Sequence, residues 1–162
     1  CLIDMDGDTT LLFNNHLQSN AISPEEKNAY GDAIEQYDKE KMKTSGKILL
    51  SRLSTAAAKR AEQADSVCAI VERHGKHTII VAGDMNDTPQ SPFIKGLSRN
   101  WKIIAPNEEP TFPADKPSVT IDYIAAKKKC GREIKAVDSR VIEEPTASDH
   151  RPIATTIIIK NR

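Results

Sequence analysis

The fold of this chain is decided by the stretch His77-Thr78-Ile79-Ile80-Val81-Ala82-Gly83-Asp84-Met85-Asn86. The run His77–Ala82 is apolar almost throughout, which predicts a strand buried on both faces. Residues 83–87 then form a polar loop at the carboxyl end of that strand, where α/β folds place their ligands. The stretch therefore predicts a core strand with a candidate site at its end.

The chain before this strand predicts a hairpin and two helices. The runs Cys1–Met5 and Thr9–Leu17 flank an Asp-Gly pair, which is typical of a β-hairpin. Ser23-Pro24-Glu25-Glu26 has the residues of a capping box and predicts a helix that reaches about Lys43. We expect a break at Thr44-Ser45-Gly46, and then a second helix from about Lys47 to His74.

The second helix carries apolar residues at three- and four-residue steps, which predict one buried face. These residues are Leu49, Leu50, Leu53, Ala57, Ala61, Ala64, Cys68 and Val71.

The chain after the core strand predicts a short helix opened by Ser91-Pro92, followed mainly by strands. The expected strands are Trp101–Ile104, Val119–Ala126, Ile134–Ile142 and Pro152–Ile159, with a proline-rich loop over Asn107–Ser118. This order of elements predicts sheets covered by helices, an α/β (α+β) fold.

Composition restricts the function only loosely. The length of 162 residues suits one domain, and 23 basic and 23 acidic residues give a formal net charge of zero. Proteins that grip nucleic acid without sequence preference usually carry a positive excess, so a nuclease is not favoured, although nucleic acid stays a possible partner. A local cluster, Lys127-Lys128-Lys129 with Arg132, could contact phosphates, but a solvated strand end is the commoner explanation. The three cysteines show no C-x-x-C spacing, so they do not indicate a metal site. The sequence contains no stretch of 18 apolar residues, so no membrane span is predicted.

Four polar motifs are candidates for chemistry, and most have an ordinary alternative. Gly83-Asp84-Met85-Asn86-Asp87 offers a carboxylate and an amide for a phosphoester site, yet taken alone it is more typical of a turn. Ser148-Asp149-His150 pairs a carboxylate with an imidazole, and alone it is more typical of a polar loop. His16 at a strand end could contact a phosphate, although a single histidine is more often structural. Asp122 lies inside an apolar strand, where pairing with a histidine is the favoured interpretation.

The order and spacing of these motifs are more specific than any one of them. A strand ending in His16-Leu17, then Gly83-Asp84-x-Asn86, Ile121-Asp122-Tyr123-Ile124 and Ser148-Asp149-His150-Arg151-Pro152, resembles the C-terminal portion of the endonuclease/exonuclease/phosphatase (DNase I-like) superfamily. Pro89 and Pro110-Thr111-Phe112-Pro113 fit the same pattern. The resemblance spans His16 to about Ile159.

This resemblance implies a Mg²⁺-dependent phosphoester hydrolase, of phosphodiesterase, phosphatase or nuclease type, with Mn²⁺ or Ca²⁺ as alternative ions. It implies that Asp84 lies beside the metal and the attacking water, that Asn86 holds the scissile phosphate, and that Asp149 contributes to the metal site. It further implies that His150 acts as general base or phosphate contact, oriented by Asp122, and that His16 stabilises developing charge. The class of phosphoester substrate and the cellular compartment are left open.

The family fold is a four-layer α/β/β/α sandwich, and its N-terminal half supplies an asparagine and a metal-binding glutamate. Nothing before His16 matches those residues, so we expect residues 1–162 to be half to two-thirds of one domain. We expect this portion alone to be weakly active or inactive, to bind Mg²⁺ weakly, and to cover an exposed sheet face by self-association or by pairing with another chain segment. A non-catalytic binding module with the same fold is the alternative, and the polar helix Ser23–Lys43 is where we expect substrate-selecting contacts.

Overall fold

The computed structural model describes residues 1–5, 8–106, 109–127 and 132–161. The chain divides into two compact units. Unit 1 comprises Cys1–Leu17 and Val67–Arg162, and unit 2 comprises Gln18–Ser66. Each unit is described by itself below.

Within the described residues of unit 1, five strands form a mixed sheet in the order β1-β2-β3-β5-β4. The strands are β1 (Leu2–Met5), β2 (Asp8–His16), β3 (Thr78–Asp84), β4 (Trp101–Ala105) and β5 (Asp122–Lys127). β2 and β3 run parallel, and the other neighbours in this sheet are antiparallel. A second sheet pairs β6 (Arg132–Val141) with β7 (Ile153–Asn161). The expected α/β (α+β) class is therefore confirmed, as is the antiparallel pairing of the first two strands, whose Asp6-Gly7 turn lies outside the described residues.

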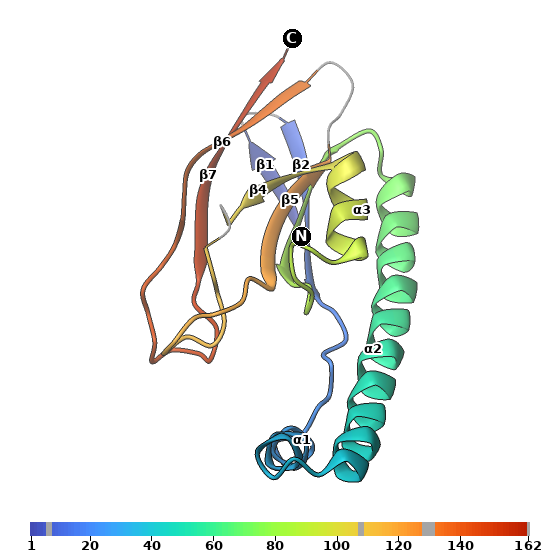
Figure 1. Cartoon of the computed structure of the whole chain (residues 1–162). Helices are drawn as coiled ribbons and strands as arrows, with labels where there is room; N and C mark the ends of the chain where they lie inside the picture. The colour runs from blue at the N-terminus through green and yellow to red at the C-terminus, as the bar shows by residue number, and fades with distance from the viewer. Residues whose placement is uncertain (6–7, 107–108, 128–131, 162) are drawn as a thin grey trace. The chain divides into compact units, whose positions relative to one another are not determined.

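The central strands of the five-stranded sheet are covered on both faces (Figure 1). On one face, Ile79, Val81 and Tyr123 pack with residues of α3 (Pro92–Asn100) and of the C-terminal end of α2 (Lys39–Arg73). On the other face, Ile80 and Ala126 pack with residues of β6 and β7. Successive side chains of β3 thus enter different cores, which is why this strand is apolar without interruption. A helix layer, a sheet and a second sheet are three layers of the expected sandwich.

Unit 2 contains α1 (Pro24–Glu35) and most of α2. The predicted capping box is present: Ser23 Oγ accepts from the Glu26 amide at 3.2 Å, and the Glu26 carboxylate accepts from the Ser23 amide at 3.0 Å. The predicted helix end at Lys43 is wrong, because α1 ends at Glu35 and Tyr37 takes a positive φ of 53°.

The predicted break at Thr44-Ser45-Gly46 is also wrong, since α2 runs straight through it. The hydroxyls of Thr44 and Ser45 donate to carbonyls one turn back, Glu40 O and Lys41 O, at 2.9 and 2.6 Å. A Cβ at position 46 would lie 3.3 Å from the Tyr30 ring, so glycine here lets α1 pack closely on α2. Residues that read as helix breakers are accommodated by local bonds and by helix packing.

The predicted buried face of α2 holds only near its C-terminal end, where Val71 is fully buried. Leu50 is 67% exposed, and the buried positions further along are Ala56 and Arg60. None of the helices in the described part of the chain combines the length and apolar character of a membrane span.

Candidate functional site

Strand register brings three of the predicted residues into one row across the sheet of unit 1. His16 on β2 is the register partner of Asp84 on β3, and Asp84 is the partner of Asp122 on β5. β2 and β3 end at this edge, and antiparallel β5 begins there. Neighbouring strands lie about 4.8 Å apart, so polar residues from distant parts of the sequence become adjacent.

Gly83 allows the two parallel strands to approach each other at this edge. Its φ is +128°, and a Cβ placed on it would lie 1.9 Å from the Asn15 carbonyl oxygen of β2. Only glycine tolerates both the backbone angle and the contact. The residue therefore fixes the spacing of β2 and β3 next to His16 and Asp84.

The loop after β3 holds the Asp84 carboxylate in place. The Asn86 backbone amide donates to Asp84 Oδ1 at 2.7 Å, and Asn86 Nδ2 donates to Asp84 Oδ2 at 2.8 Å. Asn86 Nδ2 also donates to the Leu17 carbonyl at 3.0 Å. Both amide hydrogens are thereby engaged, so in this structure Asn86 orients Asp84; its expected phosphate contact stays a prediction.

Asp122 and His150 form the closest pair of the site. Asp122 Oδ2 lies 2.9 Å from His150 Nδ1, as the sequence predicted for an aspartate in an apolar strand. The same oxygen accepts from the Thr111 hydroxyl at 2.6 Å. Two bonds to one carboxylate oxygen fix its orientation, and through it the plane of the imidazole.

Two imidazoles flank Asp84. Its Oδ2 lies 3.5 Å from His16 Nε2 and 3.9 Å from His150 Nε2. The His150 side chain is 25% exposed and packs against the Phe112 ring, with centroids 4.8 Å apart, whereas the His16 side chain is 76% exposed. His150 is therefore held rigidly, and His16 lies open to a ligand.

Asp149 is exposed and does not belong to the group formed by Asp84, Asp122 and His150. Ser148 Oγ lies 3.3 Å from its Oδ1, and its backbone carbonyl accepts from the Ala114 amide. Its charge reaches His150, where it helps to raise the imidazole pKa. Its predicted role as a metal ligand stays a prediction.

The pKa values of Asp84 and His150 are both raised. Burial raises the pKa of Asp84, and the nearby Asp122 charge raises it further, against the lowering effect of the Asn86 amide and the two histidines. Burial lowers the pKa of His150, but the Asp122 hydrogen bond and the charges of Asp122, Asp84 and Asp149 outweigh it, so the net shift is upward. Both shifts are what a crowded, partly desolvated group of carboxylates produces.

A cation could be held by the same residues. Asp84, Asp122 and His150 each offer one ligand atom, and these atoms lie within 4.8 Å of one another. Carboxylate oxygens suit Mg²⁺, and a cation here would lie beside two carboxylates, those of Asp84 and Asp122. Asp84 and Asp149 were the predicted metal ligands, and of these Asp84 belongs to this group. The other two members, Asp122 and His150, were predicted as catalytic residues.

A cavity of about 360 Å³ adjoins the pair of Asp122 and His150. Its walls are polar at this end, and apolar where Ala82, Ile124 and Ile153 line it. A ligand in this cavity could place a polar group beside Asp122 and His150 and a less polar part against Ala82, Ile124 and Ile153.

Sequence reasoning missed Thr111 and Arg151. Thr111 is fully buried. Arg151 holds the loop that contains it, because the Arg151 backbone amide donates to the Thr111 carbonyl at 2.8 Å. Arg151 Nε also donates to the Ala114 carbonyl at 2.8 Å. The quoted Pro110-Thr111-Phe112-Pro113 motif contained the signal for Thr111. Nothing in its spacing showed that the hydroxyl meets Asp122.

Comparisons with known proteins concern the fold. No family model and no curated protein matches the chain. The structure is similar to an endonuclease/exonuclease/phosphatase from Bacteroides vulgatus, with 20% identity, a TM-score of 0.45, and coverage of 64% of this chain and 44% of that one. It is also similar to a functionally unknown conserved protein from Enterococcus faecalis V583, with 16% identity, a TM-score of 0.48, and coverage of 94% and 51%. The chain thus spans about half the length of these proteins.

Proposed function

We propose that this chain carries the catalytic residues of a metal-dependent phosphoester hydrolase. The observation that carries the proposal is the Asp122–His150 pair, joined at 2.9 Å, beside an Asp84 carboxylate that two imidazoles flank. A turn or a polar loop requires none of these contacts. Phosphoester hydrolysis requires a group that moves a proton to or from water and donors for phosphate oxygens.

His150 is the proton-handling group in this proposal. Ionised Asp122 accepts from Nδ1–H, which leaves Nε2 free to act on water or on a phosphate oxygen. The Asp122 hydrogen bond and the neighbouring carboxylates shift the pKa of His150 upward, which favours the protonated imidazole as a proton donor. His16, exposed on the other side of Asp84, is placed to donate to a phosphate oxygen.

The sequence resemblance associates Asp84 with a cation, and the closeness of its ligand atom to those of Asp122 and His150 supports this role. When bound there, a divalent ion such as Mg²⁺ would polarise phosphoryl oxygens and acidify a bound water. The part of this chain is to hold the ion and to orient the reactants around it.

The test is hydrolysis of bis-p-nitrophenyl phosphate and p-nitrophenyl phosphate by the protein at its full natural length, with Mg²⁺, Mn²⁺ or Ca²⁺ and with EDTA. We expect metal-dependent turnover that falls by two or more orders of magnitude in His150→Ala, in line with the effect of removing a catalytic acid or base. His74→Ala is the matched control, because His74 is exposed in a turn after α2. Unchanged turnover in His150→Ala would refute the assignment, and phosphate binding without any turnover would support the binding module instead.

A further inference from the structure

Helix α2 carries a run of charge that the proposed hydrolytic site does not use. From Lys41 to Ala61 the sequence has six basic residues and no acidic one, although the whole chain has 23 of each. The six are Lys41, Lys43, Lys47, Arg52, Lys59 and Arg60. Charge of one sign gathered on one element attracts ligands of the opposite sign.

A cavity of about 480 Å³ lies inside unit 2, between this basic part of α2 and the extended segment Gln18–Ala21. None of the eleven described residues that line it is acidic. Lys47, Ser51, Thr55 and Lys59 follow one another at four-residue steps, so they share one face of the helix. The helical wall of the cavity thus offers cations and hydroxyl groups.

The opposite wall, the segment Gln18–Ala21, is held in place by the buried side chain of Arg60. Arg60, 4% exposed, donates to the Gln18 carbonyl at 3.0 Å and to Asn20 Oδ1 at 2.9 Å. Gln63 Oε1 accepts from the Gln18 amide at 2.8 Å. Because Arg60 can only donate, Asn20 must present its NH₂ group as the free end of its amide. This wall is therefore held in place and adds a further donor.

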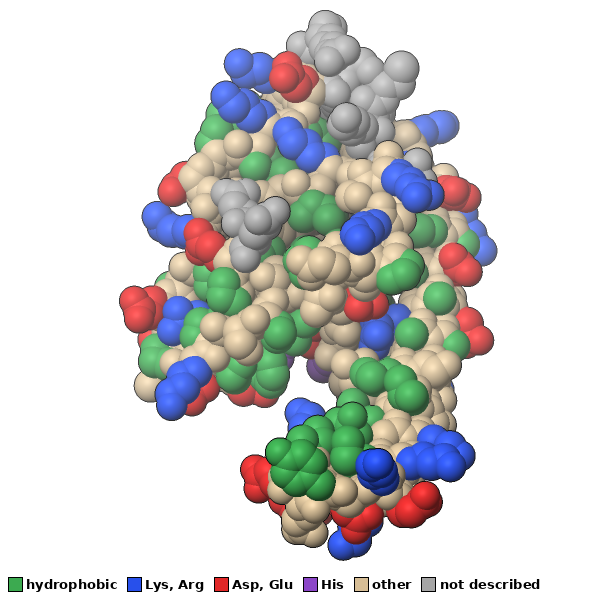
Figure 2. Space-filling view, in the orientation of Figure 1, with side chains coloured by type: hydrophobic (Ala, Val, Ile, Leu, Met, Phe, Trp, Pro, Cys, Tyr) green, Lys and Arg blue, Asp and Glu red, His purple; other side chains and the backbone are tan. Residues whose placement is uncertain are grey.

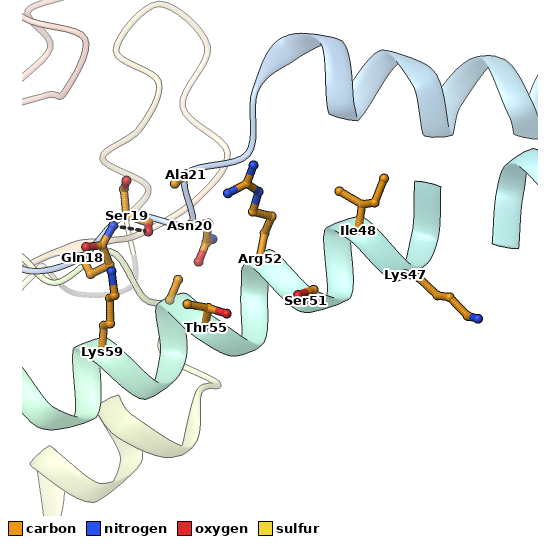
Figure 3. A pocket seen from close by; sticks show the side chains of 11 residues that line it. Gln18, Ser19, Asn20, Ala21, Lys47, Ile48, Ser51, Arg52, Thr55 and Lys59 are labelled. Atoms are coloured by element: carbon orange, nitrogen blue, oxygen red, sulfur yellow. Dashed lines mark hydrogen bonds between the residues drawn. The ribbon is translucent and has the colours of Figure 1, made fainter. Parts of the chain in front are cut away.

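The charged side chains differ in how they face the cavity. In Figure 3, Arg52 and Lys59 rise from α2 toward the segment Gln18–Ala21, whereas Lys47 points away from it. Arg52 Nε donates to Glu26 Oε1 at 3.1 Å, so part of its charge is compensated. Lys59 has no acidic partner among the described residues, which leaves its ammonium group as the main uncompensated charge at the cavity.

We propose that this cavity binds the phosphate group of a small phosphorylated molecule. Lys59 and Arg52 supply the charge, and Ser51, Thr55 and Asn20 supply neutral donors. Phosphate has more acceptor oxygens and more charge than a carboxylate, so it makes fuller use of donors that come from two walls. The volume exceeds what one phosphate needs, and Ile48 and Ala56 provide an apolar surface for an organic group.

Phenyl phosphate is the probe, titrated by calorimetry at low salt into the metal-free protein in EDTA, which withholds the metal that the proposed hydrolysis requires. We expect saturable binding that weakens about tenfold in Lys59→Ala, the loss typical of one charged hydrogen bond. Lys43→Ala is the matched control, because Lys43 belongs to the same basic run but does not line the cavity. We expect it to bind within twofold of the unmodified chain, and His150→Ala likewise, which separates this site from the hydrolytic one.

Several results would overturn the proposal. Absence of saturable binding would do so, as would an equal loss in Lys43→Ala and Lys59→Ala, which would indicate diffuse attraction. Loss of binding in His150→Ala would assign the ligand to unit 1. Equal affinity for benzoate would remove the preference for phosphate, and tight binding of a single-stranded oligonucleotide without binding of phenyl phosphate would point to nucleic acid along the helix.

Discussion

Gly83→Ala should strongly destabilise unit 1, because the added methyl group has no room. Its carbon would lie 1.9 Å from the Asn15 carbonyl oxygen, 2.9 Å from the Asn15 carbonyl carbon and 3.0 Å from the Asn15 nitrogen. All three are backbone atoms of β2, so no side-chain rotation relieves the contact. Restoring an ordinary separation requires β2 and β3 to move apart by more than about 1 Å where Asn15 pairs with Gly83.

The magnitude follows from two terms. A side chain held at a φ of +128° costs about 1–3 kcal/mol in strain. Displacing the strand pair disturbs adjacent ladder bonds worth roughly 1 kcal/mol each. We therefore expect a loss of at least about 3 kcal/mol in the free energy of unfolding, which is a large share of the stability of an ordinary domain.

Urea unfolding followed by fluorescence measures this loss directly. Trp101 is the only tryptophan of the chain and is 6% exposed in the core of unit 1. Gly96→Ala is the matched control: Gly96 lies inside α3, and a Cβ there meets nothing within 4 Å. It should gain about 0.5–1 kcal/mol from helix propensity. A Gly83→Ala protein within about 1 kcal/mol of the unmodified chain would show that the strands are not held as described.

Three further predictions concern the site. Asp122→Asn should lower turnover by about two to four orders of magnitude with the fold intact, because an amide no longer fixes the His150 tautomer; a change below tenfold in kcat would contradict the pairing. Thr111→Val should lower kcat while Thr111→Ser retains most of it, since only the hydroxyl reaches Asp122; equal loss in both would mean that Thr111 acts through packing alone. In EDTA, the stabilisation that His150 gives relative to His150→Asn should be complete below its ordinary pKa of 6.5 and disappear as pH rises through the higher folded value, because a raised pKa favours the protonated folded form; a pH-independent difference in unfolding free energy would contradict this.

The sequence predicted the core of the fold well where the pattern reports burial directly. The uninterrupted apolar run of β3 predicted a strand with two buried faces, and Thr78–Val81 are buried. The capping box at Ser23 and the cap at Ser91 located the starts of α1 and α3, because these signals depend on residues a few positions apart.

Errors arose where tertiary contacts override local preference. Thr44, Ser45 and Gly46 favour turns in isolation, yet in the folded chain they are helical, with both hydroxyls bonded to the preceding turn and Gly46 facing the Tyr30 ring of α1. Likewise, apolar periodicity cannot show that the buried face of α2 is occupied by Ala56 and Arg60. What a helix buries is set by the segment that packs on it, and that segment is distant in sequence.

The candidate site shows the same division between what is local and what is not. Asp84 and His150 were identified because each lies in a short polar motif. Asp122 was identified because an aspartate inside an apolar strand is costly unless it is paired. The hydroxyl of Thr111 and the carbonyl of Leu17 were not found, because only strand register and loop packing bring them to Asp122 and Asn86.

The cost of assembling this site is visible in Asp84. Its carboxylate is partly desolvated and lies near that of Asp122, so its pKa is raised and its ionised form is disfavoured. Hydrogen bonds from Asn86 hold it there nonetheless, at 2.7 and 2.8 Å. A cation at Asp84 would offset the repulsion between the Asp84 and Asp122 carboxylates and would favour the ionised form of Asp84. The electrostatic cost and the proposed chemistry thus have one cause, a carboxylate that neighbouring residues hold in a partly desolvated place beside a second carboxylate.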